Sequence, residues 1–292
     1  MPGQARIQVY RSLEYQRNMR ILYQKILPRI LLVTLSVIYI LPYYWMIVTS
    51  IKSNEEMRMI PPTFFPRSFI FQNYVLAVNY IPFLTFFKNS MIITVFSMCG
   101  AVITNSLVAY GLSRISWPGR EALFSLIIAT ILIPFPVVLV GLFDIFAKLR
   151  LVNTFVPLIL PYFVGSGTYT FMMRQYLFGI PKEISDSGYV DGANEFRIFL
   201  SLILPLMKPV IAVVGIFSAL ASWNDFLGPL IYLSKRSLYP LSIGLQFFRS
   251  EYNVEYSLLM AASTLVALPV VVIFLCFQRF FVSGITMGAI KG

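Results

Sequence analysis

The sequence predicts an all-α integral membrane protein with six transmembrane helices. Of the 292 residues, 58% are hydrophobic and only 12% are charged, whereas a soluble domain carries about 25% charged residues. The apolar residues also gather in six runs, each long enough to cross a hydrocarbon core, which takes about 20 residues in a helix. We therefore expect the chain to lie in a lipid bilayer.

The six expected spans follow from the ends of the apolar runs. They are residues 29–50, 89–112, 122–143, 154–174, 208–233 and 257–281. The first run is too long for the apolar part of a signal peptide, and five more follow it, so we interpret it as a retained anchor. Cys99 and Cys276 lie inside apolar runs, which indicates neither a disulfide nor a metal site.

Basic residues predict the orientation, because loops rich in Lys and Arg stay in the cytoplasm. An even number of spans places both ends of the chain on one side of the membrane. Six basic residues lie in or beside the tail 1–28, namely Arg6, Arg11, Arg17, Arg20, Lys25 and Arg29. We therefore expect this tail and the tail 282–292 to be cytoplasmic.

The segment 51–88 lies on the outer side in this topology, and it has two interpretations. It combines prolines with aromatic residues, namely Pro61, Pro62, Pro66, Pro82, Phe64, Phe65, Phe69, Phe71 and Tyr74. Aromatic side chains gather at the level of lipid headgroups. The same side chains would also suit a docking surface for an external partner.

Several kinds of site are missing from the sequence. The chain has no histidine, which excludes imidazole metal ligands and histidine-based catalysis. It also has no G-x-x-x-x-G-K-[ST] phosphate loop, so it should not bind ATP by that route. Asp225 is the one clear acid within the spans, whereas proton- or sodium-driven carriers place ionisable groups in the membrane.

Residues 183–196 form a polar segment between two apolar runs and predict a helical hairpin. Pro181 suits the first turn of a helix, and Glu183 suits the positive N-terminal end. We expect this helix to run to about Asp191 and to end at Gly192 in the left-handed conformation. Asn194 would then cap a second helix.

The second helix of the hairpin has one apolar stripe. Its members are spaced at i, i+3, i+4 and i+7, and they are Phe196, Phe199, Leu200 and Ile203. Pro205 and Pro209 should end this helix and bend the chain into the next span. Either this amphipathic hairpin merely connects two spans on the cytoplasmic face, or it has a function of its own.

The spacing of this segment resembles the EAA loop of ABC-importer permeases. The family pattern is E-A-A, three residues, G, nine residues and I-x-L-P, and the chain matches it with Asp186-Ser187-Gly188, Gly192 and Leu202 to Pro205. Asp replaces Glu here, and Ser-Gly replaces Ala-Ala. Gly188 should weaken the helix by about 1 kcal/mol relative to alanine.

Longer matches resemble the carbohydrate-uptake, MalG-like branch of this family. The sugar-permease form of the loop, I-P-K-E, Y-[IV]-D-G-A and L-P-L-x-K-P, occupies 180–183, 189–193 and 204–209. Similar stretches begin at Asn89 (NSMIITVFSMCGAVITNSLVAYGLSR) and Ser222 (SWNDFLGPLIYL), and FVSGITMGAIKG closes the sequence. The resemblance implies a type-1 permease domain over 87–281 with an EAA loop at 180–205.

The resemblance also implies a function and partners. The chain would be the non-catalytic permease subunit of an ATP-driven importer, moving a mono- or oligosaccharide across a bacterial inner or plasma membrane. It would bind no cofactor, metal or nucleic acid itself. Two cytoplasmic ATPase subunits would bind ATP and magnesium, and a second homologous permease and an extracytoplasmic solute-binding protein would complete the complex.

Two sets of residues are candidates for these roles, the first transferred by the family pattern and the second chosen for polarity within the spans. The residues expected to contact the ATPase are Glu183, Asp186, Asp191, Gly192, Ala193 and Phe196. Polar residues within the spans are candidates for the substrate pathway, and they are Asn105, Ser106, Trp223, Asn224 and Asp225. The alternative for Asn105 and Asn224 is that they hold helices together by hydrogen bonds.

Two other functions stay open from the residues alone. A self-sufficient secondary carrier or channel for a small polar solute would not need a loop that docks an ATPase. A membrane-embedded enzyme would need clustered catalytic residues near the membrane surface, and we find none in the sequence.

Overall fold

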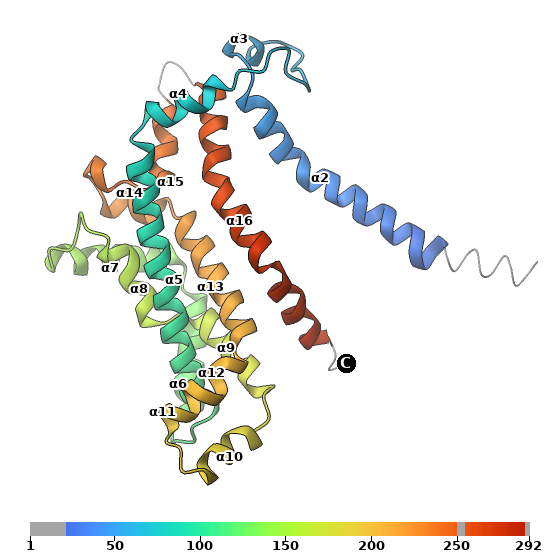
Figure 1. Ribbon diagram of the computed structural model, residues 1–292. Helices are drawn as coiled ribbons and strands as arrows, with labels where there is room; N and C mark the ends of the chain where they lie inside the picture. The colour runs from blue at the N-terminus through green and yellow to red at the C-terminus, as the bar shows by residue number, and fades with distance from the viewer. Residues whose placement is uncertain (1–21, 250–254, 290–292) are drawn as a thin grey trace, which may run out of the picture. The chain divides into compact units, whose positions relative to one another are not determined.

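The computed structural model describes residues 22–249 and 255–289, and Figure 1 shows their helices. The predicted tail 1–28 therefore lies mostly outside the described residues, as do residues 290–292 of the C-terminal tail. The chain divides into two compact units. The first contains residues 1–74 and 256–264, and the second contains residues 75–255 and 265–292.

The first unit begins with a π-helical turn, Leu22–Ile26, and helix α2 (Leu27–Ser50), which contains the predicted span 29–50. Apolar side chains of α2 are exposed along most of its length, as Leu32 and Val33 are, each at 63%. Exposed apolar side chains on a helix of this length are typical of a lipid-facing span. Helix α3 (Asn54–Met57) follows it.

The segment after α2 folds around buried polar groups. Glu56 is buried, and its carboxylate accepts hydrogen bonds from Thr63 Oγ1 at 2.5 Å and from the backbone N–H of Arg67 at 3.1 Å. Burial alone raises the pKa of this carboxyl. The hydrogen bonds and the positive charge of Lys52 lower the pKa by more than burial raises it, so the net shift is downward. The carboxylate therefore stays ionised and holds the segment together.

Two aromatic residues of the same segment pack against aromatic rings near the C-terminal end of α2. The ring of Phe64 lies 5.8 Å from that of Trp45, and the ring of Phe65 lies 6.3 Å from that of Tyr44. Both phenylalanines remain largely exposed. Their place beside the last turns of a span agrees with the headgroup-level interpretation, while a docking role stays a prediction.

The second unit is built around α5 (Phe83–Ser113), which contains the predicted span 89–112. Figure 1 shows α5 with α8 (Val156–Val164), α9 (Gly167–Phe178) and α13 (Lys208–Trp223) beside it, and all three pack against it. Small residues of α5 permit this packing. A Cβ on Gly100 would collide with the ring of Phe163.

The two ends of α5 meet different elements. Near its N-terminal end lie α15 (Leu241–Gly244) and the 3-10 turn Arg236–Leu238. Helices α10 (Glu183–Val190) and α11 (Glu195–Ile198) lie at its C-terminal end, at the bottom of Figure 1. Helix α4 (Gln72–Tyr80) precedes α5, and the 3-10 turn Leu245–Phe248 follows α15.

Residues 122–143 do not form the single helix that their apolar run predicted. Helix α6 (Arg120–Ala129) and the 3-10 turn Thr130–Leu132 are followed by α7 (Phe135–Lys148), and the two parts are bent by 101°. Pro134 and Pro136 are the reason, because proline lacks the backbone N–H and disfavours the helical conformation of the preceding residue.

Two other expected spans are also broken. Residues 154–174 divide between α8 and α9 at Gly165, whose φ is +101°. Residues 208–233 divide between α13 and α14 (Leu227–Tyr232), with Asn224, Asp225 and Phe226 between them. The last span, 257–281, lies within the continuous helix α16 (Tyr256–Ala289).

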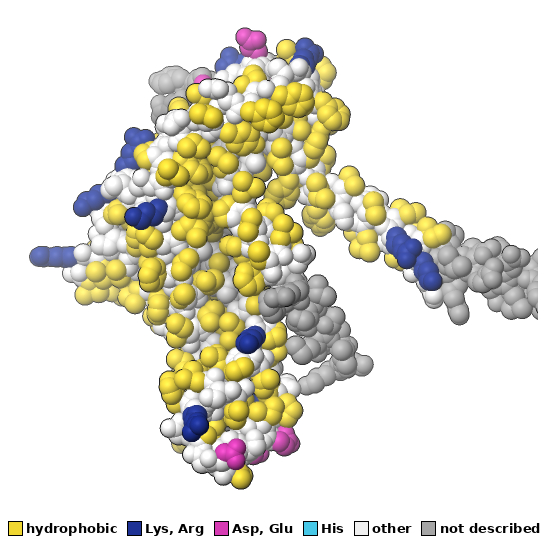
Figure 2. Space-filling model, in the orientation of Figure 1, with side chains coloured by type: hydrophobic (Ala, Val, Ile, Leu, Met, Phe, Trp, Pro, Cys, Tyr) yellow, Lys and Arg dark blue, Asp and Glu magenta, His cyan; other side chains and the backbone are white. Residues whose placement is uncertain are grey.

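The predicted count of six spanning helices is therefore not confirmed. Among the described residues, three helices are long and apolar enough to cross a membrane, and two bent pairs would raise the number to five if each forms one span. Hydrophobic side chains cover much of the visible face around α5 in Figure 2. The all-α membrane class stands, but three of the six expected spans are broken: 122–143 at prolines, 154–174 at Gly165, and 208–233 at residues 224–226.

Candidate functional site

The predicted hairpin is present at the C-terminal end of α5. Helix α10 leads to Gly192, whose φ of +73° is left-handed, as predicted. The side-chain oxygen of Asn194 accepts a hydrogen bond from the backbone N–H of Arg197 at 2.9 Å and caps α11, also as predicted. A π-helical turn, Phe199–Ile203, and α12 (Leu204–Leu206) complete the second arm.

The apolar stripe of the second arm differs from the prediction. Phe199 and Ile203 are buried, but Phe196 is 66% exposed and Leu200 is 43% exposed, and the buried position belongs to Ile198 instead. The prediction assumed α-helical spacing throughout. A π-helical turn contains more residues than an α-helical turn, so it changes which side chains face the core.

Gly188 has a packing role that the family pattern did not reveal. A Cβ at this position would lie 2.9 Å from carbons of both Ile198 and Leu202. Real Cβ atoms do not approach neighbours this closely, so the glycine lets α10 rest on the second arm. The departure from Ala-Ala therefore suits the close packing of this hairpin.

One face of the hairpin is not covered by any other part of the chain that the structure describes. It combines acids with apolar side chains, namely Glu183, Asp186, Asp191, Tyr189, Val190 and Phe196, all of them exposed. Val190 is 88% exposed. Figure 2 shows acidic side chains at this end of the molecule. An apolar tip rimmed by charge is a typical docking surface for another protein.

Hydrogen bonds fix the hairpin to its own chain. The carboxylate of Glu195 accepts hydrogen bonds from the hydroxyls of Tyr189 in α10 and Tyr110 in α5, the latter at 2.7 Å. The hydrogen bond to Glu195, together with burial, raises the pKa of Tyr189 to about 12. This hydroxyl therefore remains protonated at neutral pH and donates to the carboxylate.

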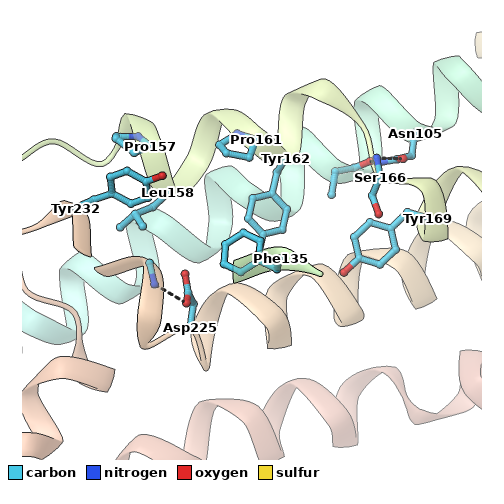
Figure 3. A pocket seen from close by; sticks show the side chains of 12 residues that line it. Asn105, Phe135, Pro157, Leu158, Pro161, Tyr162, Ser166, Tyr169, Asp225 and Tyr232 are labelled. Carbon is cyan, nitrogen blue, oxygen red and sulfur yellow. Dashed lines mark hydrogen bonds between the residues drawn. The ribbon is translucent and has the colours of Figure 1, made fainter. Parts of the chain in front are cut away.

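A cavity of about 250 Å³ lies in the second unit, and Figure 3 shows its lining. Helices α5, α7, α8, α9 and α14 contribute to its wall. The labelled lining residues are Asn105, Phe135, Pro157, Leu158, Pro161, Tyr162, Ser166, Tyr169, Asp225 and Tyr232. Aromatic rings and a few polar groups therefore line one cavity, a combination that is typical of ligand pockets.

The predicted pathway residues divide between the cavity and other places. Asn105 and Asp225 line the cavity, whereas Trp223 and Asn224 do not. The indole N–H of Trp223 donates to the carbonyl of Val266 at 3.2 Å, and the Asn224 amide donates to Leu220 O at 2.9 Å. The hydroxyl of Ser106 donates to Val102 O at 2.6 Å within α5.

Asn105 holds helices together. It is fully buried, and its amide nitrogen donates to Ala101 O at 2.6 Å. Its side-chain oxygen accepts hydrogen bonds from the backbone of Ser166 at 2.9 Å and from the Thr170 hydroxyl at 2.8 Å. The alternative role in helix packing therefore suits Asn105, since this side chain is largely satisfied within the chain.

Sequence reasoning did not single out the tyrosines of the cavity. Tyr232 is only 3% exposed, and its hydroxyl has no hydrogen-bond partner among the described residues. A buried polar group without a partner is costly. Asp225 lies between α13 and α14, where its carboxylate accepts a hydrogen bond from the backbone N–H of Gly228 at 3.1 Å. A ligand with several hydroxyl groups could pair with both side chains.

Comparison with known families identifies the chain. The family described as "Binding-protein-dependent transport system inner membrane component" matches residues 101–286, which include the hairpin and every residue that lines the cavity. The chain belongs to this family. It is an inner-membrane permease of the ABC-importer kind, as the resemblance predicted.

Individual relatives agree with this assignment. The chain is 35% identical over 262 residues to the arabinooligosaccharides transport system permease protein AraQ of Bacillus subtilis, which covers 88% of this chain and 92% of AraQ. It is 31% identical over 268 residues to the probable starch degradation products transport system permease protein AmyC of Thermoanaerobacterium thermosulfurigenes, covering 92% and 97%.

A solved structure supports the fold. The crystal structure of a bacterial ABC transporter involved in the import of the acidic polysaccharide alginate contains a chain with a TM-score of 0.78 and 21% identity, covering 89% of this chain and 97% of that one. The predicted type-1 permease fold is therefore confirmed. Permeases of this family are non-catalytic membrane subunits, so an ATPase and a solute-binding protein belong to the same system.

Among the described residues, no three His, Cys, Asp or Glu side chains come close enough to hold a metal ion. The candidate functional features are therefore the exposed face of the hairpin and the cavity lined by residues of the second unit. Family membership argues against the alternatives of a self-sufficient carrier and of a membrane-embedded enzyme.

Proposed function

We propose that this chain is the permease subunit of an ATP-driven importer for a sugar, and that the hairpin at 180–205 couples it to the ATPase. The exposed acidic and apolar face of the hairpin carries this proposal. AraQ and AmyC, at 35% and 31% identity, are named for the transport of arabinooligosaccharides and starch degradation products. A mono- or oligosaccharide is therefore the expected substrate class.

The hairpin suits a mechanical coupling role because it is both exposed and internally fixed. Phe196 and Val190 project apolar surface that no described residue covers, while Ile198 and Ile203 anchor the second arm in the core. Glu183, Asp186 and Asp191 would meet basic or backbone donor groups of the ATPase. Ala193 and Gly192 would allow close approach.

The same proposal sets the assembly and its orientation. The hairpin faces the cytoplasm, where two ATPase subunits bind ATP and magnesium, and both ends of the chain lie on that side. A second homologous permease forms the other half of the pathway. The solute-binding protein docks on the opposite surface of the membrane, which is that of a bacterial inner or plasma membrane.

Reconstitution tests this function. The purified chain alone in proteoliposomes should neither hydrolyse ATP nor accumulate sugar, because it lacks a phosphate loop and half of the pathway. Co-expression with the ATPase, second permease and solute-binding protein should give sugar-stimulated ATP hydrolysis, measured with arabinotriose, maltotriose and glucose as probes. Accumulation of any probe by the chain alone would instead support a secondary carrier.

We further propose that the cavity holds one sugar ring during transport. Sugars offer hydroxyl groups for hydrogen bonds and an apolar ring face for contact with aromatic rings. Asp225 and Tyr232 would bind hydroxyls, and the rings of Tyr162 and Tyr169 would face the sugar. Trp223 and Asn224 would then support the surrounding helices without touching the substrate, and Asn105 would hold the cavity wall together.

Replacing Tyr232 with phenylalanine tests the cavity. Without a ligand, removing a buried hydroxyl that has no partner should leave stability unchanged or raise it. If the hydroxyl binds sugar, transport of the native sugar should fall about tenfold, while the melting temperature of the complex does not fall. Transport and melting temperature are measured on one preparation.

The control is Tyr239→Phe, because the Tyr239 hydroxyl donates to Ser234 O at 3.2 Å and does not line the cavity. It should leave transport close to the wild-type rate. Wild-type transport by the Tyr232→Phe complex would contradict the sugar-binding role of this hydroxyl.

A further inference from the structure

We propose that Glu195 is a positioning residue that fastens the hairpin to α5 and makes α5 the spanning helix that receives the ATPase-driven movement. This inference rests on the proposed coupling function of the hairpin. Glu195 lies outside the set of residues that the family pattern assigns to ATPase contact. Its role follows instead from hydrogen bonds inside the chain.

The carboxylate of Glu195 bridges three elements. One oxygen accepts from the hydroxyl of Tyr189 in α10, and the other accepts from the hydroxyl of Tyr110 in α5 at 2.7 Å. Glu195 itself begins α11. One side chain therefore joins both arms of the hairpin to a helix that is 31 residues long.

The α5 end of this bridge is rigid. Tyr110 is only 5% exposed, and its ring lies 5.0 Å from that of Phe199 in the second arm. Its hydroxyl has a fixed acceptor, and its ring is held by the core formed with Met173 and Leu177 of α9. Hydrogen bonds to a charged acceptor are also stronger than those between neutral groups.

A second tie starts from the next turn of the same helix. Arg114 caps α5, and its guanidinium donates to the carbonyls of Leu177 at 2.6 Å, Ile180 at 2.5 Å and Pro181 at 3.3 Å. Residues 110 and 114 lie four apart and share one face of the helix. The same face of α5 therefore contacts the hairpin at two places. Arg114 hydrogen-bonds the chain where it enters the hairpin, and Tyr110 hydrogen-bonds Glu195 where the second arm begins.

This arrangement connects the hairpin with the cavity. Asn105 lines the cavity, and it precedes Tyr110 by five residues, about 7.5 Å along a helix axis. A displacement of α5 along its axis would therefore move the cavity wall. Helix α13 offers a different route, because it continues from the second arm across a bend of 79°.

The test uses the complex with its ATPase, second permease and solute-binding protein in proteoliposomes. In Tyr110→Phe the bridge to α5 is lost, but the exposed face of the hairpin is unchanged. We expect sugar transported per ATP hydrolysed to fall about tenfold, with ATPase retention and basal ATP hydrolysis at wild-type levels. Glu195→Ala should give the same loss.

Conservative and matched variants separate positioning from simple structure. Glu195→Gln should retain most of the coupling, because its amide oxygen accepts from one tyrosine hydroxyl while its nitrogen donates to the other. Tyr176→Phe is the control, since the Tyr176 hydroxyl donates to Leu206 O at 3.1 Å and ties α9 to α12 rather than to α5. It should leave the coupling unchanged.

A double-mutant cycle decides whether Tyr110 and Glu195 act through their shared hydrogen bond. The double variant Tyr110→Phe with Glu195→Ala should be no worse than either single variant. Additive losses, or wild-type coupling in Tyr110→Phe, would overturn the proposal, as would an equal loss in Tyr176→Phe. Loss of ATPase retention in Tyr110→Phe would also overturn it, because that result indicates a merely structural role.

The proposed function fails in a different way. If the wild-type complex shows no sugar-stimulated ATP hydrolysis, the coupling role of the hairpin itself is wrong. Stimulated hydrolysis in the wild type, together with normal transport per ATP in Tyr110→Phe, rejects only the bridge through Glu195.

Discussion

Replacing Gly192 with valine is expected to abolish most coupled transport while the chain still inserts into the membrane. The φ of Gly192 is +73°, and a Cβ there would meet no atom within 4 Å. Space is therefore not the obstacle. The left-handed conformation costs about 1–2 kcal/mol for an L residue, and a β-branched side chain tolerates it worst.

The consequence should appear at the contact with the ATPase. The backbone N–H of Gly192 donates to Tyr189 O at 3.0 Å, and that of Ala193 donates to Gly188 O at 2.9 Å. A changed φ would break this turn and misdirect α11, so the acids and Phe196 would no longer lie on one face. We expect ATPase retention and sugar-stimulated hydrolysis to fall at least tenfold, measured by co-purification and phosphate release.

Gly192→Asn provides the matched control, because asparagine tolerates the left-handed conformation better than other non-glycine residues. It should restore most of the retention. If Gly192→Val retained wild-type transport, the assignment of this hairpin to coupling would be wrong.

Local chemistry explains why this part of the hairpin could be predicted from the sequence. A glycine that ends a helix and an asparagine that caps the next one act within a few residues, and both behave as expected here. The continuous spans 29–50, 89–112 and 257–281 could also be predicted from the sequence, because the length of an apolar run indicates a spanning helix without any knowledge of tertiary contacts.

The predictions of a straight span at 122–143 and of the buried stripe in the second arm were wrong because apolar spacing alone does not show helix breaks or π-helical turns. Residues 122–143 are as apolar as a straight span, yet Pro134 and Pro136 bend them by 101°. The π-helical turn at Phe199–Ile203 changed the buried stripe, and α-helical spacing could not anticipate it. A pair of prolines two residues apart therefore indicates a bend inside an apolar run.

The cavity lay beyond sequence reasoning for a different reason. Tyr162, Tyr169 and Tyr232 come from three helices, and only the packing of those helices brings them together (Figure 3). Tyrosines are common in membrane proteins, so their presence carried no signal. An aromatic residue next to polar residues, such as Trp223, suggests a pathway residue, but the indole N–H of Trp223 donates to Val266 O in a helix contact.

Replacing Phe196 with alanine is expected to weaken ATPase binding without destabilising the chain itself. The side chain is 66% exposed, so its truncation removes little packing within this protein. A buried aromatic anchor in an interface contributes about 2–4 kcal/mol. The affinity for the ATPase should therefore fall at least about 30-fold, since 1.4 kcal/mol corresponds to a factor of ten.

Leu200→Ala is the matched control for this variant. Leu200 lies one turn further along the second arm and is 43% exposed, but it stands outside the set of residues assigned to ATPase contact. The ATPase dissociation constant and the melting temperature of the purified permease pair are measured for both variants. We expect both melting temperatures to stay within about 2 °C of the wild type, and only Phe196→Ala to lose affinity.

The comparison distinguishes an interface anchor from a lipid contact. If Phe196 merely rests in the headgroup region beside the membrane, alanine should leave the ATPase affinity unchanged and weaken only the association of the hairpin with lipid. Equal affinities for wild type and Phe196→Ala would contradict the anchor role. A loss shared equally by Leu200→Ala would instead spread the contact over the whole second arm, and Phe196 would no longer be its centre.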